Sequence, residues 1–217
     1  MELPANLDRL LGRRDVVVVE GEDALVYLQS QVSQDLDGIT VGEARWTFVL
    51  DPTGKIDGFA RVTRVGDTRF EFDTDEGFGE SLAARIDRFK IRVKAETSFG
   101  EPIGEPADET ARIAAGWSRL GAEITPGETI PPGTGLTRIA VSYTKGCYPG
   151  QELVERMDSR AAEAPKSLRR LTVAEGAAPG DQIVDDGTEV GVLTSVSGTD
   201  ALGWVKRNSD LGTTVQF

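Results

Sequence analysis

The sequence contains no histidine and only one cysteine, Cys147. Histidine is the commonest metal ligand in proteins and the commonest general base near neutral pH. With one thiol and no imidazole, we expect no metal site, and the Ser-His-Asp and Cys-His mechanisms are excluded. A single cysteine cannot form an internal disulfide bond, so nothing in the sequence favours a secreted protein.

Long apolar segments are also missing. No stretch approaches the roughly 20 apolar residues that a membrane-spanning helix requires. The first residues, Met1 to Asn6, lack the basic region and the apolar core of a signal peptide. We therefore expect a cytoplasmic protein with no membrane partner.

Positive charge is scarce. The chain has 24 Lys and Arg against 36 Asp and Glu, which gives a formal net charge of -12. Such a surface repels a nucleic-acid backbone, so we expect no direct nucleic-acid partner, and an anionic ligand must find a local basic pocket. The 217 residues, 39% hydrophobic and 28% charged, are enough for one large or two small globular domains.

The first part of the chain has the pattern of an α+β domain. Residues 16–19 form a short apolar run, and residues 44–50 alternate between apolar and polar, as in a half-buried strand. A turn at residues 51–54 leads into further strand patterns at 55–64 and 69–73. Three consecutive strands with short turns predict an antiparallel meander.

Helical spacing of apolar residues predicts two helices packed on this sheet. One opens at Glu22 and Asp23 and carries Leu25, Leu28 and Val32 on one face, and the other covers residues 78–89. Residues 91–95 are a candidate for a further strand, and residues 111–120 for a short helix.

The last part of the chain has an all-β pattern. Short strand patterns separated by Gly and Asp run from Leu168 to the last residue, which predicts a small C-terminal β-barrel. The expected organisation is an N-terminal α+β domain over residues 1–97, a Gly- and Pro-rich linker over 98–111, a segment with the motif described next over 112–166, and the barrel over 167–217.

The segment Lys145-Gly146-Cys147-Tyr148-Pro149-Gly150-Gln151-Glu152 places the only thiol between two glycines. Pro149 suits the first turn of a helix, so Cys147 is expected just before a helix N-terminus. Exposed amide groups there, and the nearby charge of Lys145, both favour a thiolate. The carboxylate of Glu152 can accept two parallel donors, the pattern that an aminopyrimidinone ring presents.

A structural interpretation of the same residues stands beside this one. A free cysteine is often a small buried hydrophobe, and Cys147 is then inert. Glu152 and Arg156 are spaced i, i+4 and can simply pair on a helix surface. Trp46 and Trp117 are expected to be core residues rather than ring-stacking ligand contacts.

The string from Lys145 to Glu152, followed after three residues by Arg156, resembles the YgfZ family signature K-G-C-[FYWL]-x-G-Q-E-x-x-x-[RK] at every specified position. Weaker similarities to the family occur in residues 27–35, 51–55, 112–116 and 130–131. The chain therefore resembles the YgfZ family, whose members are related to the glycine cleavage T-protein.

The resemblance implies a tetrahydrofolate-binding fold in which three domains surround a central pocket. It also implies a role in the maturation or repair of iron–sulfur proteins, which would be the partners, including an enzyme of tRNA modification. The family's functional Lys and Cys correspond to Lys145 and Cys147, the candidate catalytic residues. The candidate folate-binding residues are Arg112, Tyr148, Gln151, Glu152 and Arg156.

The chain also departs from the family pattern. Between residues 89 and 112, where the family carries a further subdomain, only a linker is expected, so the folate pocket would be more open or completed by a second chain. Two alternatives remain open at this point. One is a folate-dependent aminomethyltransferase like the T-protein, and the other is an interaction module that binds no folate. Whether the protein is an enzyme, and its oligomeric state, are not decided by the sequence.

Overall fold

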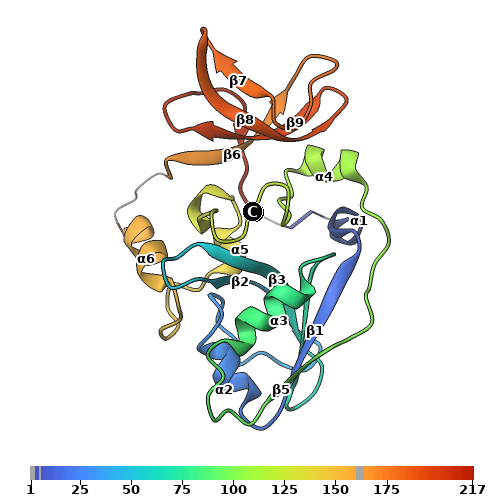
Figure 1. The fold of residues 1–217 in the computed structure, drawn as a ribbon, viewed down its shortest axis with the longest axis vertical. Coiled ribbons are helices and arrows are strands. Elements are labelled where there is room, and N and C mark those ends of the chain that lie inside the picture. The colour runs from blue at the N-terminus through green and yellow to red at the C-terminus, as the bar shows by residue number, and fades with distance from the viewer. Residues whose placement is uncertain (1–2, 5, 160–163) are drawn as a thin grey trace.

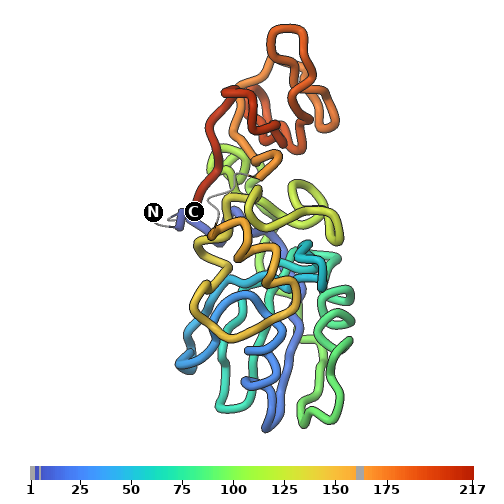
Figure 2. The backbone as a smooth tube through the Cα atoms, turned by 90° about the vertical axis from the view of Figure 1, so that its left-hand side faces the viewer, coloured from blue at the N-terminus to red at the C-terminus, as the bar shows by residue number. Residues whose placement is uncertain are grey.

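The computed structural model describes residues 3–4, 6–159 and 164–217. It is an α+β structure built on two five-stranded antiparallel sheets. Figure 1 shows the N-terminal sheet at one end of the molecule and the C-terminal sheet at the other. In the perpendicular view of Figure 2, the segment coloured yellow, which carries residues near 125–155, lies between the two ends.

The N-terminal sheet has the strand order β2-β3-β4-β1-β5. The predicted meander is confirmed, because β2 pairs with β3 and β3 with β4 in antiparallel register. The expected strand over residues 91–95 is wrong. Arg92 has φ 57°, a left-handed conformation that interrupts an extended strand, and the chain becomes extended only afterwards. The strands are β1 (Arg14–Glu20), β2 (Ala44–Leu50), β3 (Ile56–Arg64), β4 (Arg69–Asp75) and β5 (Glu96–Phe99).

Both predicted helices pack against this sheet, and a short N-terminal helix contributes Leu10 and Leu11 to the central apolar cluster. The helices are α1 (Leu7–Leu11), α2 (Ala24–Gln29) and α3 (Gly79–Asp87). Helix α2 ends earlier than its apolar pattern suggests. Val32 lies beyond its end, buried in an isolated bridge with Val49. The hydroxyl of Ser30 donates to the carbonyl of Tyr27 at 2.7 Å and so occupies an acceptor at the end of the helix.

The C-terminal strands form an open sheet of order β10-β6-β9-β8-β7. The predicted small barrel is therefore not shown as a closed sheet in the part of the chain that the structure describes. Closure requires the two edge strands to pair along their length, and here β7 has four residues and β10 only two. The strands are β6 (Lys166–Thr172), β7 (Gln182–Asp185), β8 (Thr188–Ser197), β9 (Asp200–Lys206) and β10 (Thr213–Thr214).

Short helices lie between the two sheets. They are α4 (Glu109–Ala115), the 3-10 turn η1 (Pro131–Gly133), α5 (Thr137–Ala140) and α6 (Gln151–Ser159). The segment expected as a linker is partly ordered into elements, because it includes the end of β5, a bridge from Ile103 to Arg14 and the start of α4. Gly116 ends α4 with φ 80°, earlier than expected.

The central core joins both ends of the molecule. Trp46 stacks on Phe59 with 4.9 Å between ring centroids, and Trp117 lies edge-on to Trp46 at 5.0 Å and to Phe217 at 5.2 Å. Both tryptophans are buried, as expected for core residues. Leu202 of the C-terminal sheet belongs to the same cluster. No helix within the described ranges is long and apolar enough to cross a membrane.

Candidate functional site

Lys145 joins the signature segment, residues 145–156, to the end of helix α2. Its ammonium group donates hydrogen bonds to the backbone carbonyl oxygens of Gln29, Val32 and Gln34, at 2.7, 2.6 and 3.0 Å. Three carbonyls match the three donors of an ammonium group, and a cation is favoured at the C-terminal end of a helix. Lys145 therefore fixes the start of the signature segment against the N-terminal domain.

The environment of Lys145 alters its protonation equilibrium. The residue is only 9% exposed, and burial lowers its pKa to about 8, against the opposite effect of the carboxylates of Asp35 and Asp37. The ring of Tyr148 lies 5.3 Å from the ammonium nitrogen, within the range of a cation–π contact. At neutral pH the group is charged and holds its three carbonyl partners.

Cys147 is exposed at the surface, so the alternative in which it is a small buried hydrophobe is wrong. Helix α6 begins at Gln151 and not at Pro149. The reason is Gly150, whose φ of 80° is incompatible with an α-helix. The thiol therefore lies on an irregular stretch ahead of the helix, open to solvent and to a partner.

Gly150 also allows the signature segment to approach the turn between β2 and β3. A Cβ atom on Gly150 would lie 2.5 Å from the carbonyl oxygen of Asp51, and one on Gly54 would lie 2.5 Å from the Cβ of Leu153. Side chains cannot be accommodated at such distances. The signature segment and the turn at residues 51–55, which both resemble the YgfZ family, are thus in direct contact. Each side of this contact requires a glycine.

Helix α6 presents charged residues along one wall of a shallow pocket of about 560 Å³. The side chain of Glu152 is 93% exposed and lies 4.0 Å from the guanidinium of Arg156, which is 51% exposed. This is a loose surface ion pair of little energetic weight, which leaves both groups free to contact a ligand. The pocket is lined by Tyr143, Glu152, Glu155, Arg156, Asp158 and Ser159.

Tyr148 lies on the inner side of the segment, and Gln151 is half-buried beside it. Tyr148 is buried in the central core, burial raises its pKa, and its hydroxyl has no hydrogen-bond partner within the described ranges. The side-chain oxygen of Gln151 accepts a hydrogen bond from the backbone N–H of Tyr148 at 3.3 Å, and its amide nitrogen donates to Glu155. Gln151 therefore orders the turn that precedes α6.

Arg112 forms its hydrogen bonds away from the signature segment. It is fully buried and bonds to Glu123 at 2.9 Å, to Glu109 at 3.0 Å and to the hydroxyl of Ser195 at 2.7 Å. It also donates to the carbonyl of Trp117. These contacts join α4 to β8, and none of them is made to the signature segment.

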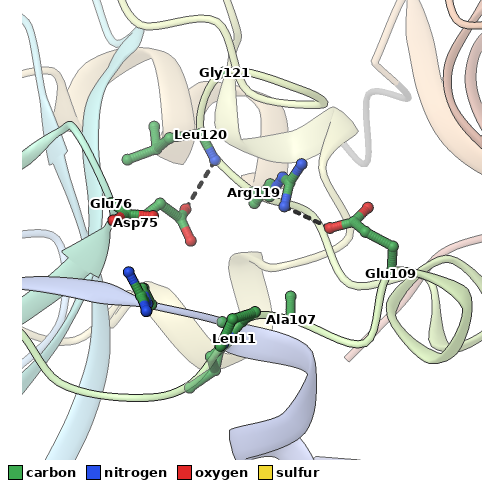
Figure 3. Close-up of a pocket in the computed structure, with 11 residues that line it drawn as sticks. Leu11, Asp75, Glu76, Ala107, Glu109, Arg119, Leu120 and Gly121 are labelled. Carbon is green, nitrogen blue, oxygen red and sulfur yellow. Dashed lines mark hydrogen bonds and ion pairs between the residues drawn. The ribbon is translucent and has the colours of Figure 1, made fainter.

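The sequence reasoning missed a second set of buried charges. Asp75, at the end of β4, accepts hydrogen bonds from Arg14 at 2.7 Å and from the backbone N–H of Leu120 at 2.9 Å. Burial raises the pKa of Asp75, and the charge of Arg14 opposes that effect. Figure 3 shows Asp75 facing Arg119 and Glu109 across a pocket of about 620 Å³. No local motif distinguishes these residues. In the sequence, a single charged residue at the end of a helix or strand looks like an ordinary solvent-exposed residue.

Metal ligands are not gathered anywhere in the described part of the chain. No group of three or more His, Cys, Asp or Glu side chains there is arranged to hold a metal ion.

Comparisons with known proteins were made by sequence and by structure. No protein-family profile matches the chain. An uncharacterised protein from Haemophilus influenzae is 26% identical over 255 aligned positions, which cover 95% of this chain and 91% of that protein. An aminomethyltransferase from Nostoc sp. is 26% identical over 189 positions, which cover 87% of this chain but only 47% of that protein.

The structural comparison identifies the fold. The glycine cleavage system aminomethyltransferase T from Bartonella henselae superimposes with a TM-score of 0.80, over 97% of this chain and 87% of that one, at 15% identity. Identity this low establishes the fold alone. The chain therefore has the fold of the glycine cleavage T-protein.

Proposed function

We propose that this protein binds tetrahydrofolate and acts as an accessory protein for iron–sulfur proteins, in their maturation or repair. The observation that carries the proposal is the anchored signature segment. Lys145 holds it against the N-terminal domain through three carbonyl groups, and Cys147 beside it is exposed. The T-protein-like fold and the aminomethyltransferase relative support a folate-related role.

The residues along α6 fit a folate chemically. The carboxylates of Glu152 and Glu155 can accept hydrogen bonds from the amino and ring N–H groups of a pterin. Tyr143 offers a partly exposed aromatic ring, and Arg156 offers a cation for a glutamate carboxylate. When bound, the folate would supply one-carbon chemistry. The protein's own residues would orient it, and Cys147 would present a thiol to a client protein.

Two measurements test folate binding. Calorimetric titration with tetrahydrofolate should detect binding, and Glu152→Gln or Arg156→Gln should weaken it by about tenfold, as expected for the loss of one charged hydrogen bond. Glu175→Gln, an exposed position outside the pocket, is the matched control. Absence of any binding would contradict the proposal and favour the alternative of an interaction module without folate.

The role of Cys147 is tested separately. A strain that lacks its own gene for this protein should lose activity of an iron–sulfur enzyme, and the wild-type chain should restore it while Cys147→Ser should not. Equal rescue by both proteins would exclude a role for the thiol. Alkylation of native Cys147 by iodoacetamide should proceed at a rate within a few-fold of that in the urea-unfolded chain, because the side chain is exposed.

An aminomethyltransferase activity is the second candidate, favoured by the similarity to the Nostoc enzyme. A glycine cleavage assay with a lipoylated partner protein distinguishes the two functions. Folate binding without turnover supports the accessory role, whereas turnover that depends on folate supports the enzyme.

A further inference from the structure

A second pocket lies between the C-terminal sheet and the loop that leads into η1. Its volume is about 370 Å³, and it shares no residue with the pocket along α6. This volume is at the lower end of the range of ligand pockets, about 300–1,000 Å³, so it suits a ligand with one ring system. The lining residues are Glu128, Thr129, Ile130, Pro165, Lys166, Trp204 and Lys206.

The pairing of β6 with β9 concentrates positive charge at this pocket. Lys166 lies directly opposite Lys206, and Leu168 lies opposite Trp204. Because side chains alternate along a strand, these four side chains share one face of the sheet. Leu168 and Trp204 are buried in the central core. The two lysines lie on the same face of the sheet, at its border with the pocket.

Two like charges in directly opposite positions destabilise a pair of strands. Neither lysine takes part in an ion pair within residues 3–4, 6–159 and 164–217. Lys206 donates to the carbonyl oxygen of Glu189 at 3.0 Å, and the ammonium of Lys166 lies 5.4 Å from the centre of the Trp204 ring. Among the described residues, both lysines line the pocket without a carboxylate partner there, so an anion in the pocket would be attracted by both, in a chain whose surface otherwise repels anions.

The aromatic wall of the pocket is held rigidly. The indole N–H of Trp204 donates to the carbonyl of Glu123 at 3.0 Å. On the other side, Gly133 packs so closely that a Cβ atom there would lie 2.8 Å from the indole ring. A ring fixed in this way loses little conformational freedom when a ligand stacks on it.

We propose that this pocket binds a small aromatic carboxylate. The ring of the ligand would pack against Trp204, with Ile130 and Pro165 as the remaining apolar contacts, and its carboxylate would lie between Lys166 and Lys206. Glu128, on the loop side, can accept a hydrogen bond from an amino or hydroxyl substituent. This site is independent of folate binding at α6.

The test uses 4-nitrobenzoate as the probe and 4-nitrobenzamide as its uncharged analogue. The chain has three tryptophans, so an ¹⁵N-labelled sample should give three indole N–H signals, and Trp204→Phe identifies the one of interest. The carboxylate should shift the Trp204 signal and leave those of Trp46 and Trp117 in place. The amide should bind at least tenfold more weakly.

Variants then test whether Lys166 and Lys206 provide the positive charge that binds the carboxylate. Lys166→Gln with Lys206→Gln should weaken 4-nitrobenzoate at least tenfold, while Lys90→Gln with Lys94→Gln, which changes the net charge equally at the other end of the molecule, should not. Arg156→Gln should also leave this affinity unchanged. The proposal is overturned if the Trp204 signal does not move at millimolar probe, if the amide binds equally well, or if the Lys166 and Lys206 variant, shown to be folded by its thermal unfolding, keeps full affinity.

Discussion

The Nζ atom of Lys145 lies 2.6 Å from the carbonyl oxygen of Val32, a residue 113 positions earlier in the chain. The contact links the signature segment to residues 27–35, one of the two N-terminal segments that resemble the same family. A lysine that the sequence suggested for chemistry is therefore also a structural anchor. Its removal should affect both the free energy of unfolding and the position of Cys147.

Lys145→Ala should lower the free energy of unfolding by about 2–4 kcal/mol, because three buried carbonyl groups lose a charged donor. Urea denaturation measures the loss. Lys94→Ala is the control, since that side chain is 74% exposed and its change should cost less than about 0.5 kcal/mol. If Lys145→Ala weakens folate binding but leaves the free energy of unfolding unchanged, the three hydrogen bonds of Lys145 do not stabilise the fold.

The stability of the protein should increase between pH 8 and pH 9.5. Burial lowers the pKa of Lys145 from 10.5 to about 8 in the folded state, so within this window the unfolded chain binds more protons than the folded one. The free energy of unfolding then rises with pH, by up to about 2 kcal/mol at pH 9.5. Lys145→Met should lack this rise when urea denaturation is repeated at each pH.

The window ends below pH 10 for a reason that can be checked. Burial raises the pKa values of Tyr148 and Tyr27 above the ordinary value of 10.0. A raised tyrosine pKa contributes stability that is lost at higher pH, opposite in sign to the effect of Lys145. A free energy of unfolding that falls from pH 8 onward would contradict the assignment to Lys145.

Substitution by alanine should destabilise the protein at Gly150 and not at Gly146, the two glycines of the signature segment. Gly150→Ala forces a side chain into a φ of 80° and against the carbonyl oxygen of Asp51, and should cost about 1–3 kcal/mol. Gly146→Ala meets open space and should change stability by less than about 0.5 kcal/mol. Thermal unfolding of the two variants compares them directly. Equal effects would mean that the contact between the turn and α6 is not what requires glycine.

Arg112 and Glu123 should behave as a coupled pair. Arg112→Met leaves the buried carboxylate of Glu123 without its main partner and should cost about 3–5 kcal/mol. The double variant Arg112→Met, Glu123→Leu should lose much less than the sum of the single variants. A double-mutant cycle by chemical denaturation measures the coupling, and strictly additive losses would contradict it.

Local patterns predicted the N-terminal domain well because its elements are specified by short-range periodicity. The alternation in residues 44–50 and the helical spacing in 78–89 both correspond to observed elements, β2 and α3. The error at residues 91–95 has a local cause, the left-handed backbone of Arg92, which no apolar pattern reveals. Strand positions near the C-terminus were also recovered, but whether a sheet closes depends on edge pairing between distant strands.

The candidate site was predictable only as a segment. The signature placed Lys145 and Cys147 together, yet the partners of Lys145 are backbone carbonyls, which carry no side-chain signal in a sequence. The exposure of Cys147 likewise depends on how the segment packs. The roles suggested for Tyr148, Gln151, Glu152 and Arg156 stay predictions, as does that of Arg112.

The central apolar cluster described above also has a consequence for the order of folding. Among the residues that the structure describes, the cluster between the N-terminal sheet and its helices draws on positions from Val17 to Ala95, so it can form as soon as that part of the chain is made. The central cluster joins Leu10 to Phe217, so it cannot be completed until Phe217 has been synthesised. During synthesis, Trp46 and Phe59 can therefore meet Trp117 and Phe217 only late, and apolar surface left unpaired until then favours aggregation.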